Sequence, residues 1–304
     1  MAKLNKEVWV SQLMENFYPD SSFLKYGRDF SQLVDNDAIN MAESGLDPVV
    51  FVNNKTYPIK YIQRIDTPIR IELDKFETEN TLVRRPEVIE YAYDQLESVL
   101  MGHRNTLRAK TAEKAAHAYA PLENTKFTPV IPTTGRFLSE GRRRLTFEDI
   151  LHLKELFDAV DLPLEDRYLV LHPSHLKDLI LTDIKAFKDL TDIVNGKPKR
   201  FAGFGILQFS KPAIYNIETM EKKEYGAAAE ETDGFCSFAF QMGEIMKADG
   251  EVYMYIREDD PEQRGTIVGF DKRFIALPIR NRGIGAIVSS KVYTPTEPEP
   301  ETEV

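Results

Sequence analysis

The longest regular pattern of apolar and polar positions in this chain runs from residue 86 to residue 119. Apolar residues recur there at the helical spacing of three and four, at Ile89, Ala92, Leu96, Val99, Leu100 and Leu107. The stretch has no internal proline, Pro86 suits a first helical turn, and Pro121 follows its end. The pattern therefore predicts one helix over residues 86–119, roughly 50 Å long.

A helix of this length is more typical of an assembly component than of a catalyst, because globular helices average about 11–12 residues. The alternative is a long core helix in a single soluble protein. Residues 109–118 are rich in alanine, which would let another backbone approach closely.

A strand with one charged face precedes the predicted helix. Ile69, Ile71 and Leu73 alternate with Arg70, Glu72 and Asp74, which predicts a half-exposed strand. A second apolar run lies at residues 49–52. Pro58 and Pro68 restrict such strands to a sheet edge or an isolated ribbon. A two-stranded ribbon is marginally stable alone, so we expect this region to lie on a partner surface.

The remaining pattern mixes helices and strands. Residues 23–46 are irregular and polar, which predicts an arm lying on another surface, not a core segment. Further helices are predicted after a Thr146 cap, from a Ser174 cap to about residue 190, and near residues 242–247. Strands are predicted at residues 168–171, 201–209, 213–215, 235–240, 252–257, 266–270, 274–277 and 284–288. Residues 216–233 are predicted to form an exposed acidic excursion, and residues 293–304 a disordered tail.

Composition excludes several classes of protein. A formal net charge of −10 argues against tight nonspecific binding to nucleic acid and against an anionic membrane surface. No stretch approaches the roughly 20 apolar residues of a membrane span. The single cysteine, Cys236, fits a reducing compartment. The three arginines at 142–144 could contact phosphate, but the acidic balance favours a salt-bridged or solvated loop.

Motifs for catalysis are missing from the sequence. It contains no GxxxxGK[ST], HExxH or GxSxG pattern, and Gly203 and Gly205 lack the third glycine of a dinucleotide fingerprint. His172 and His175 form an HxxH that would be a poor preformed metal site, so an ordinary turn with a capping serine is favoured. Cys236 is interpreted as a small buried apolar residue. An active site assembled from distant residues stays open.

Six segments that occur in order carry a family resemblance. In front of the helix they read VWVSQLMENFYPDSSFLKYGRDFSQLV and YPIKYIQRIDTPIRIELDKFETENTLVRR. The helix and its successors read PEVIEYAYDQLESVLMGHRNTLRAKTAEKAAHAYAP, LTFEDILHLKELFDAVDLPLEDRYLVLHPSHLKDLI, NGKPKRFAGFGILQFSKPAIYN and KRFIALPIRNRGIGAIVSS. Together they resemble the arm, extended loop, spine helix, helix–strand–helix unit, hairpin and closing strand of tailed-bacteriophage major capsid proteins.

The resemblance implies an α+β, Hong Kong 97-type capsid fold. Its parts would be an N-terminal arm (1–48), an extended β-ribbon loop (49–84), a peripheral domain (85–150) with a spine helix (86–119), a mainly axial domain (151–265), return strands to the peripheral domain (266–290) and a disordered acidic tail (291–304). Because the sequence starts at its arm, a scaffold is expected to be a separate protein or a removed precursor segment.

The resemblance also implies a function: a structural shell subunit, not an enzyme, with no cofactor or metal. It would assemble into the pentamers and hexamers of an icosahedral head around double-stranded DNA, without sequence-specific binding and without a membrane. Portal and scaffold proteins would be further partners, and decoration proteins are left open. The location would be the virion, after assembly in the cytoplasm of the host bacterium.

Contacts between subunits are expected from the charged residues of the ribbon. They are Lys60, Arg64, Arg70, Glu72, Lys75, Glu77, Arg84 and Arg85. Two alternatives remain at this point. One is an encapsulin-like compartment that holds protein cargo, and the other is an α/β enzyme with an unrecognised site.

Overall fold

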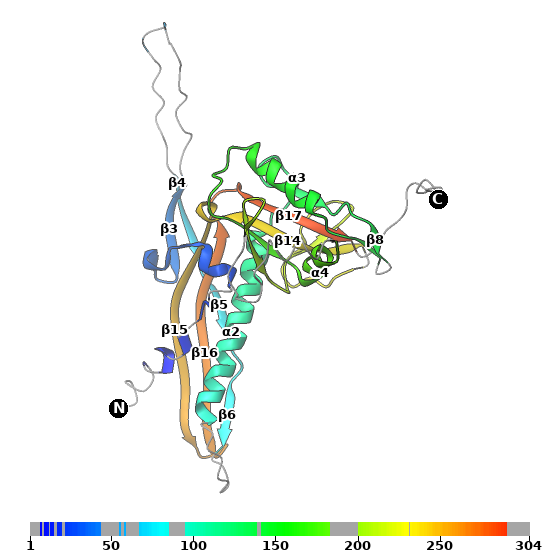
Figure 1. Cartoon of the computed structure of the whole chain (residues 1–304). Helices are drawn as coiled ribbons and strands as arrows, with labels where there is room; N and C mark the ends of the chain where they lie inside the picture. Colours follow the sequence, from blue (N-terminus) through cyan, green and yellow to red (C-terminus); the bar gives the residue numbers. More distant parts are fainter. Residues whose placement is uncertain are drawn as a thin grey trace.

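The computed structural model describes residues 7, 9–11, 13–14, 17–19, 22–43, 55, 58, 67–84, 95–138, 141–182, 200–230 and 232–290. Two parts share the long helix α2 (Gln95–Tyr119). An elongated sheet follows the helix along its length, and a broader sheet lies at its C-terminal end (Figure 1). The mixed α+β class expected from the sequence is confirmed.

The elongated sheet is built around one long antiparallel hairpin. Its strands are β1 (Arg28–Asp29), β15 (Ile245–Asp260), β16 (Gly265–Pro278), β5 (Asp74–Glu77) and β6 (Thr81–Arg84). They are ordered β1-β15-β16-β5, with β6 also paired to β16. The sequence predicted shorter, separate strands here. The pairing register of β15 and β16 shifts at two places, between 249 and 252 and between 257 and 260, and such irregularities interrupt the alternation from which strands are predicted.

The prediction of a short helix near residues 242–247 is wrong for residues 245–247. Residues 242–244 form a 3-10 turn, η4 (Met242–Glu244), and β15 begins directly afterwards at Ile245. The amide N–H of Gly243 is satisfied by the side chain of Gln241, which accepts its hydrogen bond at 2.6 Å. This local cap makes a tight turn sufficient to join the two sheets.

Helix α2 confirms the end of the predicted long helix at Tyr119, whereas residues 85–94 and the Leu96 side chain lie outside the described residues. Its buried side chains include Leu100, Leu107, Ala112, Ala115, Ala116 and Tyr119. The three alanines pack into the largest apolar cluster of the described residues, so the alanine-rich turns are part of the core.

The broader sheet has seven strands. Its order is β11-β12-β10-β14-β17-β7, with β13 beside β14. The bounds are β7 (Val130–Pro132), β10 (Arg167–Leu171), β11 (Arg200–Phe201), β12 (Phe204–Gln208), β13 (Ile214–Asn216), β14 (Asp233–Gln241) and β17 (Ile284–Ser290). Buried strands with near-continuous apolar sequence are typical of a sheet covered on both faces.

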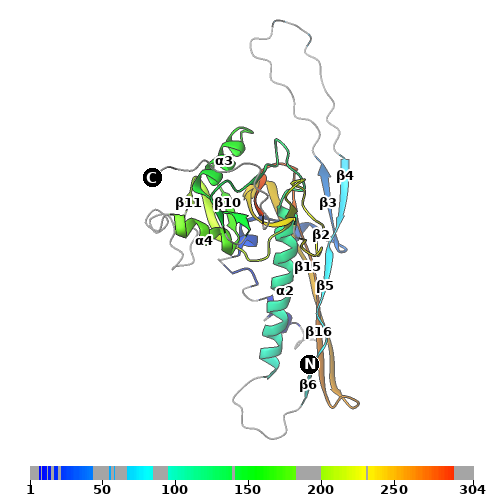
Figure 2. The same cartoon turned by 90° about the vertical axis from the view of Figure 1, so that its right-hand side faces the viewer.

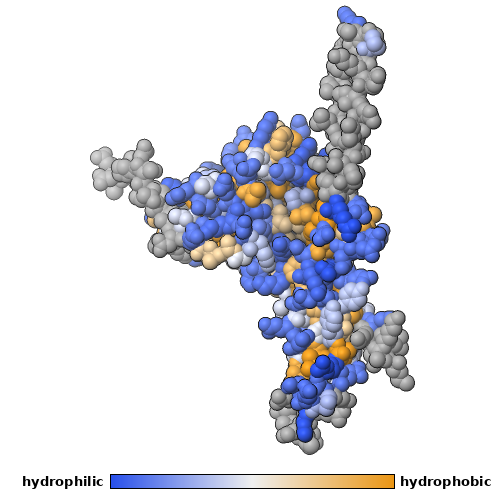
Figure 3. Space-filling model, turned by 180° about the vertical axis from the view of Figure 1, so that it is seen from behind, coloured by the Kyte–Doolittle hydropathy of each residue, from blue (hydrophilic) through white to orange (hydrophobic). Residues whose placement is uncertain are grey.

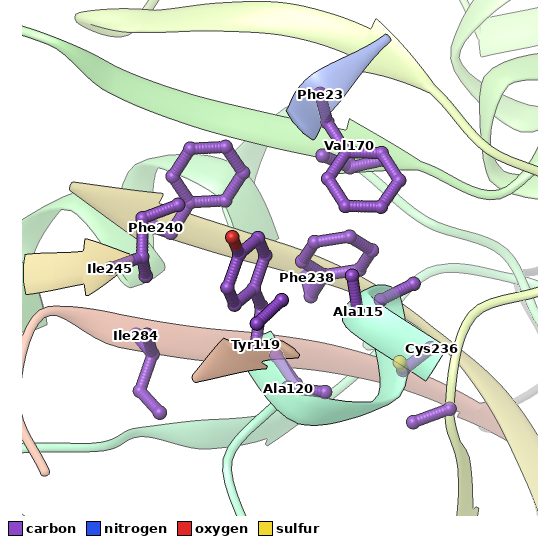
Figure 4. Close-up of a cluster of buried hydrophobic side chains, with 14 of the residues drawn as sticks. Phe23, Ala115, Tyr119, Ala120, Val170, Cys236, Phe238, Phe240, Ile245 and Ile284 are labelled. Carbon is purple, nitrogen blue, oxygen red and sulfur yellow. The ribbon is translucent and has the colours of Figure 1, made fainter. Parts of the chain in front are cut away.

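Helices cover both faces of this sheet. Val170 in β10 faces the cluster formed with the last turns of α2, while its neighbours Leu169 and Leu171 face the cluster formed with α3 (Phe147–Asp158) and α4 (Pro173–Thr182). Figure 4 shows Tyr119 of α2 among Phe238, Phe240 and Ile284 on the first of these faces. Because successive side chains of β10 point to opposite faces, the sheet lies between α2 on one face and α3 and α4 on the other.

The helix caps agree with the sequence in one case and differ in the other. Thr146 caps α3 through a capping box with Asp149, as predicted for Thr146. Helix α4 begins at Pro173, and the Nδ1 atom of His172 accepts the Ser174 amide at 3.2 Å. The Ser174 cap is wrong because proline at the first helical position moves the cap back to His172.

The segment expected to be an irregular arm contains regular structure. It holds η1 (Phe23–Tyr26), η2 (Ser31–Leu33), β2 (Val34–Asp35) and β3 (Ala38–Glu43), and β3 pairs with β4 (Thr67–Glu72) in the sheet order β2-β3-β4. Asn36 and Asp37 have φ of 48° and 58°, which suits a two-residue hairpin turn. Phe23 and Leu24 are fully buried in the largest core cluster. The prediction of a non-core arm is therefore wrong for residues 23–43.

Residues before Phe23 do lie on another surface, and it belongs to the same chain. Leu13 and Phe17 pack with Leu100 and Leu107 of α2 and with Phe270 of β16, and Trp9 and Val10 border the same cluster. Leu13 is 1% exposed and Phe17 2% exposed. This N-terminal segment, described at residues 9–11, 13–14 and 17–19, covers the helix side of the elongated sheet.

The two closing strands, β16 and β17, lie in different sheets. β16 runs beside α2 in the elongated sheet, as expected for a return strand, whereas β17 lies between β14 and β7 in the broader sheet. The two strands are joined through residues 279–283, where Gly283 adopts a φ of 70°. The tail, residues 291–304, lies outside the described residues.

Candidate assembly surface

The charged face of β4 is open in the described chain. Among the described residues, β4 is the last strand of its sheet and pairs only with β3, which agrees with the edge position predicted from Pro68. Arg70 and Glu72 are exposed, while Ile71 between them packs on the cluster around Ile39. Figure 2 shows β3 and β4 projecting beyond the elongated sheet. An edge strand with unpaired backbone groups is a ready template for another chain.

Lys75 and Glu77 already have partners in their own chain. The Lys75 Nζ atom lies 2.5 Å from Glu77 and 3.4 Å from Asp271. The hydrogen bond from Lys75 to Glu77 raises the pKa of the lysine. Their strand, β5, pairs with β16. Lys75 and Glu77 therefore make contacts within their own chain, and their contact with a neighbouring subunit stays a prediction.

The other predicted contact residues cannot be placed on a surface. Lys60, Arg64 and Arg85 lie outside the described residues. The backbone of Arg84 pairs with Gly265 at the end of β6, and its side chain lies outside the described set. Of the eight predicted residues, the structure thus brings Lys75 and Glu77 together and leaves Arg70 and Glu72 on a separate sheet.

The structure adds a surface that sequence reasoning missed. Tyr253 and Tyr255 of β15 are 52% and 55% exposed on the sheet face opposite α2. The register places Tyr253 opposite Asp271, which in turn pairs with Glu77. The Tyr255 hydroxyl donates to Asp271 at 2.9 Å. We call this face, with Lys75, Glu77, Tyr253, Tyr255 and Asp271, the outer sheet surface.

The signal for this surface was present in the alternation of residues 252–257. Val252, Met254 and Ile256 pack toward α2 and the N-terminal segment, so Tyr253 and Tyr255 must face away. Exposed tyrosines are enriched at protein interfaces because one end is apolar and the other can hydrogen-bond. Figure 3 shows the molecule from behind, with apolar side chains reaching the surface both near the broad sheet and along the elongated part.

The histidines predicted to form an ordinary turn are held by the fold. His175 is fully buried, and its Nδ1 atom lies 2.6 Å from the Ser237 hydroxyl. His172 stacks on Phe235 with ring centroids 4.0 Å apart. Burial lowers the pKa of His172 to about 4 and that of His175 well below its ordinary value, with Arg142 adding to both shifts. Both rings are therefore neutral at pH 7.

The arginine run also has a structural role. Arg142 is 3% exposed and donates to both carboxylate oxygens of Asp178, at 2.5 and 2.9 Å. Asp178 accepts the Leu145 amide as well. The salt-bridged interpretation is confirmed for Arg142, which is not accessible to phosphate or to an acidic tail.

Cys236 is fully buried, and burial raises the pKa of its thiol to about 12. The interpretation as a small buried apolar residue is confirmed. Within the described residues, His, Cys, Asp and Glu nowhere gather in a group of three that could hold a metal ion. None of the described helices combines the length and apolar character needed to cross a membrane.

The acidic excursion is anchored, contrary to its predicted exposure. Lys222 donates to the backbone oxygens of His117 and Ala120 at 2.8 and 2.6 Å, at the C-terminal end of α2. His117 Nε2 lies 2.8 Å from the Lys223 oxygen. A cation at the last carbonyls of a helix complements its dipole. Residues 224–230 are exposed, as predicted, and Tyr225 makes an edge-to-face contact with the His117 ring.

A cavity of about 540 Å³ lies beneath this excursion. Its lining is mainly apolar, with Tyr225, Phe235 and Ile214, and it also includes His117 and His172. Both histidines already use one ring nitrogen in the contacts above.

Comparison with known proteins identifies the fold. No protein-family model and no curated protein matches the sequence. Solved structures do match: the capsid of Cyanophage P-SCSP1u has a TM-score of 0.62 at 16% identity, covering 86% of each chain. The capsid of Ralstonia phage GP4 has a TM-score of 0.62 at 10% identity, covering 90% of this chain and 89% of that one. A virus-like particle from Pyrococcus furiosus has a TM-score of 0.55 at 11% identity, covering 93% and 99%.

The chain therefore has the fold of phage major capsid proteins, the Hong Kong 97 type. The fold expected from the six collinear segments is confirmed, although sequence identity to these structures is only 10–16%.

Proposed function

We propose that this chain is the major shell protein of a tailed phage or prophage. The observation that carries the proposal is the agreement of fold with phage capsids over 86–90% of both chains. The open edge of β4 and the exposed outer sheet surface support it, because such features are stable when another subunit covers them. A shell protein also needs no catalytic cluster.

The assembly would consist of pentamers and hexamers around double-stranded DNA, with portal and scaffold proteins as further partners. The head would form in the host cytoplasm and leave as part of the virion. A net charge of −10 is compatible with packaged DNA, since a strongly basic lining would hinder its loading and release. The peripheral, axial and arm divisions expected from the sequence stay predictions for this proposed shell.

Exchanging the charges of β4 tests the proposal at its edge strand. Arg70→Glu with Glu72→Arg keeps the net charge and should impair assembly, while the unfolding free energy changes by less than about 1 kcal/mol because both residues are exposed. The measurements are sedimentation of assemblies and urea unfolding of the dissociated subunit.

The matched control is Glu123→Lys with Lys126→Glu, a second exposed pair of opposite charges on the connector after α2. It should leave both measurements unchanged. Loss of subunit stability in the β4 variant equal to its loss of assembly would contradict a contact role for β4.

A second candidate is a shell that encloses protein cargo. The virus-like particle from Pyrococcus furiosus is similar over 93% of this chain and 99% of that chain, but its TM-score of 0.55 is no better than those of the phage capsids. Purified particles would distinguish the candidates: nuclease-protected DNA supports a phage head, and co-purifying protein without DNA supports a compartment.

A further inference from the structure

A charged cluster lies inside the otherwise apolar contact between the N-terminal segment and the elongated sheet. Its centre is Lys272 of β16, whose side chain is 0% exposed. The ammonium forms an ion pair with Asp249 of β15. It also lies 4.6 Å from the centre of the Phe17 ring and 4.0 Å from the Met14 sulfur. The N-terminal segment therefore forms the lid over this ammonium.

Asp249 joins the sheet to the segment. The Tyr18 hydroxyl donates to its two carboxylate oxygens at 2.7 and 2.8 Å. The Asp249 amide donates to the Ser31 hydroxyl at 2.9 Å. One carboxylate is thus shared between Lys272 of the sheet and Tyr18 of the segment, at the point where the pairing of β15 and β16 is irregular.

The charges around the cluster balance. Lys247 lies 3.7 Å above the Tyr18 ring and 3.6 Å from Asp29. Lys272 and Lys247 are thereby matched by Asp249 and Asp29. Burial lowers the pKa of Lys272 and raises the pKa of Tyr18. Covering the cluster therefore disfavours the charged form of each side chain.

A purely apolar contact would hold this segment more firmly. Burying an ion pair costs several kcal/mol of desolvation that the mutual attraction only partly offsets. When the segment lifts, Lys272, Asp249 and the Tyr18 hydroxyl regain water, so opening is less unfavourable than for an apolar joint of the same size. The neighbours Leu13 and Phe17 supply the apolar part that favours closure.

We propose that the N-terminal segment is a detachable arm held by a charge lock, in which Asp249 couples Lys272 of the sheet to Tyr18 of the arm. The closed lock is the state described here. In the open state the arm leaves α2, β15 and β16 while the two sheets keep their cores. The lock operates within one chain, so it stands independently of any shell.

Removing the carboxylate should open the lock. Asp249→Asn leaves the Lys272 ammonium buried without a counter-charge, and the chain can relieve this by releasing the arm. Hydrogen exchange of the full-length chain, read by mass spectrometry on peptides covering residues 9–18, should accelerate at least about tenfold. The buried thiol of Cys236 reports global opening in the same sample, and its labelling rate should stay unchanged.

A second variant separates the lock from general damage. Adding Lys272→Met to Asp249→Asn removes the unpaired charge, so exchange of the arm should return to the wild-type rate or slower. Asp35→Asn, at an exposed aspartate of β2, is the control and should change nothing. The proposal is overturned if Asp249→Asn leaves arm exchange unchanged, if Cys236 labelling rises in parallel with it, or if the double variant stays open.

Discussion

At the scale of single residues, the fold is held by polar side chains whose partners come from distant parts of the chain. Asp178 accepts a hydrogen bond from Arg142, which lies 36 positions earlier in the chain. His175 forms a hydrogen bond with Ser237, which lies 62 positions later. Each of these groups is buried, so each would be costly without its partner. The sequence predicted that the arginines are salt-bridged and the histidines structural, but not which residues they contact.

The neutral histidines predict how stability depends on pH. His172 and His175 both have a lower pKa in the folded chain than in the unfolded one. Below the unfolded pKa of about 6.5 the unfolded chain binds protons that the folded chain does not, so unfolding becomes more favourable as pH falls. Between pH 6.5 and 5 we expect the free energy of unfolding to drop by up to about 1.4 kcal/mol per pH unit for each histidine.

Urea unfolding at pH 6.5 and pH 5 measures this slope. His175→Gln should reduce it, whereas the same change at the exposed His152 should not. An equal slope in the wild type and in His175→Gln would show that other groups cause the acid sensitivity.

At the scale of elements, α2 carries two different contacts. Its last turns pack alanines against the broad sheet, while its earlier turns place Leu107 between the N-terminal segment and Phe270. The helix therefore ties the two sheets together. Lys222 adds a cation at its C-terminal carbonyls.

Truncating the buried face of α2 should destabilise the chain. Leu107 is 2% exposed, so Leu107→Ala should cost about 2–5 kcal/mol of unfolding free energy. Met101, on the same helix but 47% exposed, provides the control, and Met101→Ala should cost less than about 1 kcal/mol. Thermal and urea unfolding measure both. Similar effects at the two positions would show that the helix is not packed along this face.

Elements with regular periodicity could be predicted from sequence, and those defined by turns or bulges could not. The end of α2, the Thr146 cap and β10 follow local rules that the sequence carries. The β2–β3 hairpin was missed because its strands are short and its signal is only Asn36 and Asp37. The outer sheet surface was missed because the alternation of residues 252–257 gives two faces. Only the packing of Met254 on α2 and the N-terminal segment shows that Tyr253 lies on the exposed one.

At the scale of the whole molecule, the two sheets have different surroundings. The broad sheet is covered by helices on both faces. The elongated sheet is covered on one face by α2 and the N-terminal segment, and on the other face only the end around Met246, Ala248 and Ile275 is covered, by Ile39 and Ile71 of β3 and β4, among the described residues. Its outer face presents Tyr253 and Tyr255. The uncovered part of this face is therefore the part of the elongated sheet that another subunit would contact.

The acidic tail is expected to be dispensable for such packing. Residues 293–304 carry Glu297, Glu299, Glu301 and Glu303 between prolines and have little apolar surface to bury. Truncation after Lys291 should leave folding and shell formation unchanged in sedimentation and thermal unfolding. If high salt blocks assembly of the full-length chain as the truncation does, the tail instead docks on a basic surface.

Electron microscopy of the purified full-length chain tests the proposed function most directly. The shell proposal predicts closed icosahedral particles, or rings of five and six subunits that close into particles on concentration. A homogeneous population of monomers or small oligomers that never forms capsomers or shells, under conditions where the chain is folded, would contradict it.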